Sequence, residues 1–151
     1  MGQGVLTQPF PRVDGRVVCG EVSLEDLADT FGTPLYVYDL AWIRRRVAAF
    51  REAFQGADPL LAYSVKANGN LSLLRELESL GCGADITSGG ELFRARSAGI
   101  DPSDIVFAGV GKSEEEIAYA LDEGIYAFNV ESRSELARIE RVAAGKGMRA
   151  R

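Results

Sequence analysis

The chain has three lysines, and one of them occupies a position suited to chemistry. Lys66 follows the apolar run 60–65, which predicts a β-strand. Because strand side chains alternate between faces, Lys66 shares a face with Ser64 and Ala62. A lysine partly buried at the carboxyl end of a strand has a lowered pKa, and its neutral amine can attack a carbonyl carbon. The alternative is a strand-end lysine that extends into solvent.

The other two lysines have less suitable surroundings. Lys112 lies in a Gly-rich turn after the apolar run 105–108 and just before Ser113, so we expect it to face solvent. Lys146 lies beyond the last predicted helix, near a glycine, where it can meet the carbonyls that end that helix. The predicted nucleophile is therefore Lys66.

Three further features could take part in chemistry, namely Asp85 and the glycine-containing segments 88–91 and 109–113. Asp85, near the end of the second predicted strand, either orients and charge-balances Lys66 or caps a turn. The glycine pair in 88–91 either offers free amides to an anion or allows a tight strand-to-helix turn. The segment 109–113 resembles a phosphate loop, but Val106 stands where the first glycine is needed. We therefore predict no nucleoside-triphosphate site.

Composition excludes several classes of function. The absence of histidine removes Ser–His and Cys–His pairs and His-ligated metals, and Cys19 and Cys82 form no CxxC motif, which favours a reducing compartment. The net charge of -5 disfavours nucleic acid and anionic membranes as partners. No apolar run reaches the roughly 20 residues of a membrane span, and residues 1–10 lack a signal-peptide pattern. We expect a cytoplasmic protein, without a metal, that acts on small molecules.

The elements that must position Lys66 form a repeat. Strand-like runs recur about every 22 residues, and a helical pattern follows each run. Such alternation predicts a parallel sheet covered by helices, either an open doubly wound sheet or a (β/α)8 barrel. Compact, equal units favour the barrel, of which four units are half, and the chain ends where a fifth strand should begin. The predicted strands are 60–65, 83–87, 105–108 and 127–130.

Helix starts support this division. Ser88, Ser113 and Ser132 each begin an S-x-x-E sequence after a predicted strand, which is typical of a capping box. Upstream, the sequence predicts a strand within 13–19, a helix over 23–31, a β-rich run at 35–38 and a helix over 39–54 capped by Asp39.

These motifs, taken together, resemble a known family. The sequence Tyr-Ser-Val-Lys-Ala-Asn at 63–68 is similar to the lysine motif of the fold-type III, pyridoxal-phosphate-dependent amino-acid decarboxylases. The similarity covers nearly the whole chain from about Val22 and is most specific for members that act on diaminopimelate. Four more segments follow in the family's order, namely 32–39, 83–92, 105–112 and 129–132.

The resemblance implies a barrel that binds pyridoxal 5'-phosphate, joined to a β-domain. Residues 1–34 would form part of the β-domain and a connecting helix, and 35–151 the first half of the barrel. Lys66 would bind the cofactor covalently, with Asp85 and Glu91 near the lysine and the cofactor. The implied reaction converts meso-2,6-diaminopimelate to L-lysine and CO2 in a homodimer, and we expect the 151 residues alone to be inactive.

Three alternatives stay open at this point. An ornithine or arginine decarboxylase of the same fold would share these motifs, since the family's substrate-selecting residues lie beyond Arg151. A non-enzymatic pyridoxal-phosphate-binding barrel would lack the segment 32–39, which argues against it. The third alternative is a gene fragment without function.

Overall fold

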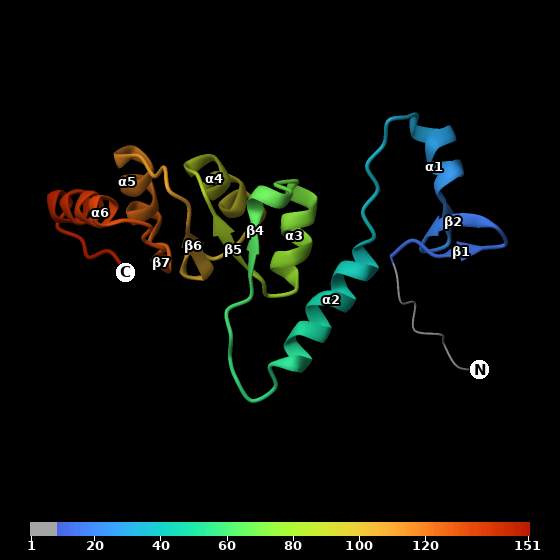
Figure 1. The fold of residues 1–151 in the computed structure, drawn as a ribbon, viewed down its shortest axis with the longest axis horizontal. Helices are drawn as coiled ribbons and strands as arrows, with labels where there is room; N and C mark the ends of the chain where they lie inside the picture. Colours follow the sequence, from blue (N-terminus) through green and yellow to red (C-terminus); the bar gives the residue numbers. More distant parts are fainter. Residues whose placement is uncertain (1–8) are drawn as a thin grey trace. The chain divides into compact units, whose positions relative to one another are not determined.

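The computed structural model describes residues 9–151 and divides into two compact units, one ending at Gly56 and one running from Ala57 to Arg151 (Figure 1). Residues 1–8 lie outside the described residues. They make up most of the segment 1–10, for which the sequence predicts no signal peptide. The predicted domain boundary after residue 34 concerns a larger protein and stays a prediction.

The first unit begins with a small antiparallel sheet. Asp14 and Gly15 both have positive φ angles, 48° and 81°, as a two-residue hairpin turn requires. Ser23 caps the following helix, accepting hydrogen bonds from two amides of its first turn. This unit contains β1 (Arg12–Val13), β2 (Arg16–Cys19), β3 (Val22–Ser23), α1 (Leu24–Phe31) and α2 (Leu40–Ala53).

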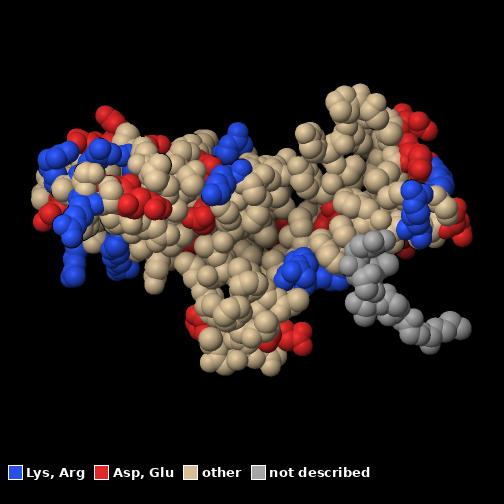
Figure 2. Space-filling view, viewed as in Figure 1, with Lys and Arg blue, Asp and Glu red and all other residues tan. Residues whose placement is uncertain are grey.

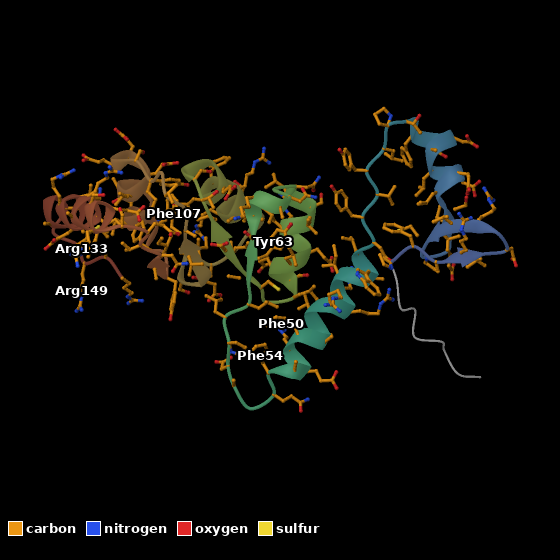
Figure 3. All side chains as sticks on the ribbon, in the orientation of Figure 1. Phe50, Phe54, Tyr63, Phe107, Arg133 and Arg149 are labelled. Carbon is orange, nitrogen blue, oxygen red and sulfur yellow. The ribbon has the colours of Figure 1, made fainter. Side chains whose placement is uncertain are left out.

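The prediction for the second half of this unit holds for the helix. The Asp39 carboxylate caps α2 by accepting a 2.9 Å hydrogen bond from the Trp42 amide. The rings of Phe50 and Phe54 stack with their centres 4.8 Å apart near the end of this helix (Figure 3). The β-rich run 35–38 forms no strand, because β-propensity acts through pairing and no described strand pairs with it.

The second unit is a parallel sheet in which a helix follows each strand (Figure 1). Hydrogen-bonded neighbours follow in chain order, β4-β5-β6-β7. The elements are β4 (Ala62–Ser64), η1 (Val65–Ala67), α3 (Leu71–Ser79), β5 (Gly83–Ile86), α4 (Gly89–Ala98), η2 (Pro102–Asp104), β6 (Ile105–Phe107), α5 (Glu114–Glu123), β7 (Ala127–Phe128) and α6 (Arg133–Gly145). All four predicted strands and their helices are present, although β4 and β7 are shorter than the predicted 60–65 and 127–130.

The two faces of this sheet differ, and the difference decides between the two predicted architectures. One face is fully buried, as Ala84, Ile86 and Phe107 show at 0% exposure. The opposite face carries the half-buried row Ser64, Asp85, Val106 and Ala127, placed side by side by the strand register. Sequential strand order with right-handed crossovers puts every helix on the same face, as in a barrel and not in a doubly wound sheet.

The core of this unit lies between the buried sheet face and the helices. Phe107, labelled in Figure 3, is its largest fully buried side chain. The centre of its ring lies 5.9 Å from the centre of the Phe128 ring. Its buried members, which are apolar side chains from all four strand–helix units, form one continuous cluster. Burial of the apolar side chains in this cluster stabilises the helices far more than their intrinsic helix propensity does.

Neighbouring helices are also joined at the surface by ion pairs. Arg96 of α4 lies 2.8 Å from Glu123 of α5, and Arg141 of α6 pairs with Glu114 of α5. Acidic and basic side chains consequently mix over this part of the surface in Figure 2. Exposed pairs of this kind contribute at most about 1 kcal/mol each, so the core dominates the stability.

All three predicted serine caps are present, but the reciprocal half of the capping box is not general. Ser88, Ser113 and Ser132 each accept a hydrogen bond from the amide of the glutamate three residues later. Only at Ser113 does that glutamate, Glu116, return to the serine amide. The other two glutamates bond one residue further back, as described for Glu91 and Glu135 below.

Candidate active site at the carboxyl edge of the sheet

Lys66 lies at the carboxyl edge of the sheet, but not at the end of a strand. The strand β4 ends at Ser64, and Lys66 is the central residue of the 3-10 turn η1. Val65, at 1% exposure, anchors this turn in the core. Lys66 itself is exposed, so the predicted burial of its amine is wrong for the described residues. The reason is that β4 ends at Ser64, so strand alternation no longer places Lys66 on a face of the sheet.

Asp85 lies beside the strand that leads to Lys66. The register pairs Asp85 with Ser64, and the Ser64 hydroxyl donates a 3.0 Å hydrogen bond to the Asp85 carboxylate. Asp85 is half-buried on the uncovered face, and it forms no ion pair with Lys66 among the described residues. The structure therefore brings the Asp85 carboxylate to the edge that carries Lys66, and its part in chemistry stays a prediction.

Glu91 has a structural partner. Its carboxylate accepts hydrogen bonds from the amide of Thr87 at 2.7 Å and from the Thr87 hydroxyl at 3.2 Å. The carboxylate thus holds the turn between β5 and α4. It bonds the amide of Thr87, one residue before the Ser88 amide that a capping box would use. Its predicted proximity to a cofactor remains a prediction.

The glycine pair after Ser88 serves the turn. The amide of Gly89 donates a 2.8 Å hydrogen bond to the Glu116 carboxylate of the next unit. An extra Cβ at Gly89 would lie 3.2 Å from the same Glu116 side chain. A carboxylate of the chain therefore occupies this helix N-terminus, which favours the tight-turn interpretation over an anion site.

Lys112 was predicted to face solvent, but the structure buries it, and the residue is only 1% exposed. Its ammonium donates to the carbonyl of Gly109 at 2.7 Å, to the carbonyl of Asn129 at 2.9 Å and to the carboxylate of Glu135 at 3.0 Å. It also lies 5.5 Å from the centre of the Phe107 ring. An ammonium has three donors, and all three are engaged, so this amine is unsuited to attack a carbonyl group.

Glu135, the partner of Lys112, was not singled out by the sequence. Burial raises the pKa of its carboxyl, but hydrogen bonds from the Glu131 amide and Lys112, with the charges of Lys112 and Arg138, hold the pKa below its ordinary value. The one available signal was its place in the Ser132 capping motif. That motif predicted a local partner, whereas the ion pair spans 23 residues.

Lys146 also differs from its prediction. It is the C-cap residue of α6, but its ammonium lies 2.9 Å from the carboxylate of Asp122 on α5 and not against the helix carbonyls. An ion pair to a neighbouring helix offers a full charge where the helix end offers a partial one. Both corrections leave Lys66 as the lysine without a described acidic partner.

A polar atom near Lys66 fits a bound group. Among the described residues, the side-chain nitrogen of Asn68 is a buried donor without a hydrogen-bond partner. Its oxygen accepts a 3.0 Å hydrogen bond from the Asn70 amide, which fixes the direction of the side chain. A primary amine, a carboxylate at Asp85 and an unused amide donor suit an aldehyde cofactor with polar ring substituents.

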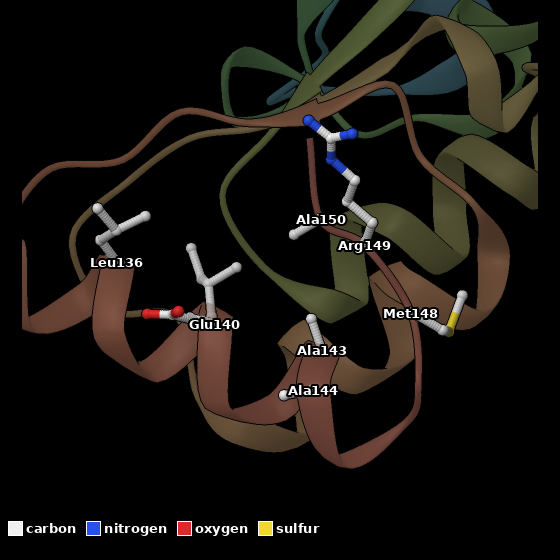
Figure 4. Close-up of a pocket in the computed structure, with 8 residues that line it drawn as sticks. Leu136, Glu140, Ala143, Ala144, Met148, Arg149 and Ala150 are labelled. Atoms are coloured by element: carbon white, nitrogen blue, oxygen red, sulfur yellow. The ribbon is translucent and has the colours of Figure 1, made fainter.

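A separate groove runs along α6 and holds none of these residues (Figure 4). Its floor is apolar, with Ile139 and Ala143 of α6, and Met148 of the following segment completes it. That segment returns toward β7, where the Phe128 amide donates a 2.8 Å hydrogen bond to the Arg151 carbonyl.

Among the described residues, every helix is too short or too polar to span a membrane.

Sequential parallel strands, helices on one face and a lysine at the carboxyl edge define a half-barrel of the pyridoxal-phosphate type, and comparison with known families agrees. Residues 40–151 match the family described as pyridoxal-dependent decarboxylase, pyridoxal binding domain, and the chain belongs to this family. Within it, the chain is 52% identical over 138 residues to the diaminopimelate decarboxylase of Aquifex aeolicus, which covers 91% of this chain and 32% of the relative.

Solved structures give the same result. A crystal structure from Aquifex aeolicus superposes with a TM-score of 0.88 at 50% identity, covering 94% of this chain and 35% of that chain. The diaminopimelate decarboxylase of Helicobacter pylori, complexed with L-lysine, superposes with a TM-score of 0.80 at 48% identity, covering 83% and 32%. The lysine/ornithine decarboxylase of Vibrio vulnificus reaches a TM-score of 0.71 at 25% identity, covering 80% and 32%. The chain spans about a third of the length of the curated relatives it matches.

Proposed function

We propose that this chain is the cofactor-binding portion of an enzyme that converts meso-2,6-diaminopimelate to L-lysine and CO2, with pyridoxal 5'-phosphate held by Lys66. The 52% identity to a diaminopimelate decarboxylase carries the choice of substrate. The lower identity of 25% to the lysine/ornithine decarboxylase disfavours the ornithine and arginine alternatives. The whole protein would be a cytoplasmic homodimer.

Each residue of the edge has a part in this proposal. When bound, pyridoxal phosphate accepts the electron pair that the departing carboxylate leaves behind. Lys66, exposed on the turn η1, would hold the cofactor through its aldehyde. Asp85, which accepts a hydrogen bond from the Ser64 hydroxyl, would supply a carboxylate at the same edge of the sheet, and Asn68 would offer its unused donor. Glu91 supports this edge indirectly, through Thr87.

The test of Lys66 is chemical labelling of the full-length enzyme. Borohydride reduction with bound cofactor, followed by peptide mapping, should place the label on Lys66. Lys112 should stay unlabelled because its ammonium is buried and fully hydrogen-bonded, and the half-exposed Lys146 reports nonspecific reaction. Lys66→Ala should lose covalent cofactor because it has no amine. Lys66→Arg should lose it too, since a guanidinium stays charged. Label on Lys112, label on Lys146 in place of Lys66, or an active Lys66→Ala enzyme would refute the assignment.

The substrate and the assembly have separate tests. The full-length enzyme should release CO2 from diaminopimelate at an ordinary rate, about 1–10³ s⁻¹, and residues 1–151 alone should not. Ornithine or arginine as the better substrate would refute the substrate assignment while leaving the cofactor site intact. Sedimentation of the active enzyme as a monomer would contradict the dimer.

A further inference from the structure

The buried pair of Lys112 and Glu135 is not used by the proposed chemistry, yet it lies at the same edge of the sheet. The side chains of Lys112 and Glu135 are 0% and 4% exposed. Every donor of the ammonium is engaged, and the second carboxylate oxygen accepts a 2.7 Å hydrogen bond from the Glu131 amide. Arg138 donates a 2.8 Å hydrogen bond to the Lys112 carbonyl. The pair is thus the centre of a complete polar network.

Stability alone does not account for such a pair. Removing two charges from water costs about as much as their attraction returns, and apolar residues of similar volume often stabilise a fold equally well. What apolar residues cannot supply is direction. The Lys112 ammonium bonds the carbonyl of Gly109 in the loop after β6 and the carbonyl of Asn129 in the loop after β7. It therefore holds two consecutive loops to each other.

The first of these loops needs such a restraint. It contains Gly109, with a φ of +86°, and Gly111, and the Val110 between them is 83% exposed. Two glycines around an unsupported residue give a loop many conformations in the absence of a fixed contact. Lys112 provides that contact from inside the loop.

The restraint continues to the strand that carries Asp85. A Cβ at Gly109 would lie 3.4 Å from the Cβ of Thr87, so the loop after β6 packs against the end of β5. Thr87 follows Asp85 on the same face, and Glu91 holds its amide. Contacts therefore connect the buried pair to the uncovered face of the sheet. Lys112 bonds Gly109, and Gly109 packs against Thr87.

We propose that Lys112 and Glu135 are positioning residues that lock the loops after β6 and β7 and thereby hold the Asp85 edge in the geometry that binds the cofactor. This inference rests on the proposed function, because it gives the pair a role toward pyridoxal phosphate. Neither side chain touches the reacting atoms in this proposal.

The test compares stability with cofactor binding in the full-length enzyme. Lys112→Met, Glu135→Gln and the double variant are each measured for melting temperature, for the Kd of pyridoxal phosphate and for visible circular dichroism of the bound cofactor. Lys146→Met is the matched control, because it makes the same change in an ion pair between α5 and α6 that lies outside the network.

Each single variant should lower the melting temperature and raise the Kd about tenfold, or about 1.4 kcal/mol. The double variant leaves no unpaired buried charge, so it should regain most of the melting temperature while the Kd stays about tenfold raised and the dichroism stays altered. Lys146→Met should change neither Kd nor dichroism. Recovery of the Kd together with the melting temperature in the double variant would show a purely structural role and overturn the inference. Absence of cofactor binding by the unmodified enzyme would instead refute the proposed function.

Discussion

Gly83 begins the strand that carries Asp85, and the structure leaves no room there for a side chain. A Cβ built on Gly83 would lie 2.1 Å from the backbone oxygen of Asp104 and 2.9 Å from a methyl carbon of Leu60. The first contact is with backbone in η2 and cannot be relieved by turning a side chain. Gly83→Ala therefore forces β5 and the chain before β6 apart.

The size of the effect follows from these distances. Cβ atoms rarely approach another heavy atom within 3.0 Å, so the backbone must move by about 0.9 Å. The moving segments flank Ala84 and Ile105, which are both fully buried. Overpacking of a filled core costs about 1–3 kcal/mol and more where backbone must shift, so we expect Gly83→Ala to lower the free energy of unfolding by about 3 kcal/mol or more.

A second glycine provides the control variant for this measurement. Gly145, the last residue of α6, has open space around its Cβ position, and Gly145→Ala should stabilise the protein by about 0.5–1 kcal/mol. Urea unfolding of both variants and the unmodified protein gives the comparison. Equal midpoints for Gly83→Ala and the unmodified protein would refute the argument, since the backbone contact would then not be rigid. Because Asp85 is two residues away, Gly83→Ala should also weaken cofactor binding.

Two further predictions concern caps and acid stability. Ser113→Ala removes the reciprocal capping box of α5 and should lower the free energy of unfolding by about 1 kcal/mol, measured by urea unfolding, and an unchanged midpoint would contradict the role of the cap. Glu135 has its pKa held below the ordinary value of 4.5, so its charge stabilises the folded state above that pH, and this contribution is lost as pH falls through the lower, folded-state pKa. The difference in the free energy of unfolding between the unmodified protein and Glu135→Gln should therefore be constant near neutral pH and narrow as the pH falls below 4.5, whereas a difference independent of pH would show that the carboxylate charge adds nothing.

Strand and helix positions followed from the sequence because they depend on local patterns. The four parallel strands were visible as apolar runs, and the serines at 88, 113 and 132 marked helix starts, since a cap bonds amides within one turn. Lys66 was marked by its place after the first of these runs and by the motif around it. In each case residues close in the chain carried the signal.

The environments of the lysines and glutamates depended on contacts that no local pattern contains. Lys112 looked like a solvent-facing residue of a glycine-rich turn, but its partner Glu135 lies 23 residues away and reaches it only when two strand–helix units pack together. The sequence left two interpretations for the Gly89 amide, an anion site or a tight turn, and only the fold placed Glu116, 27 residues on, against it. Chain pattern determined which parallel strands and helices form and in what order, but not where every strand ends, since β4 stops at Ser64. Tertiary packing alone decided which charges are buried, because a buried charge is stable only beside a partner that the fold brings to it.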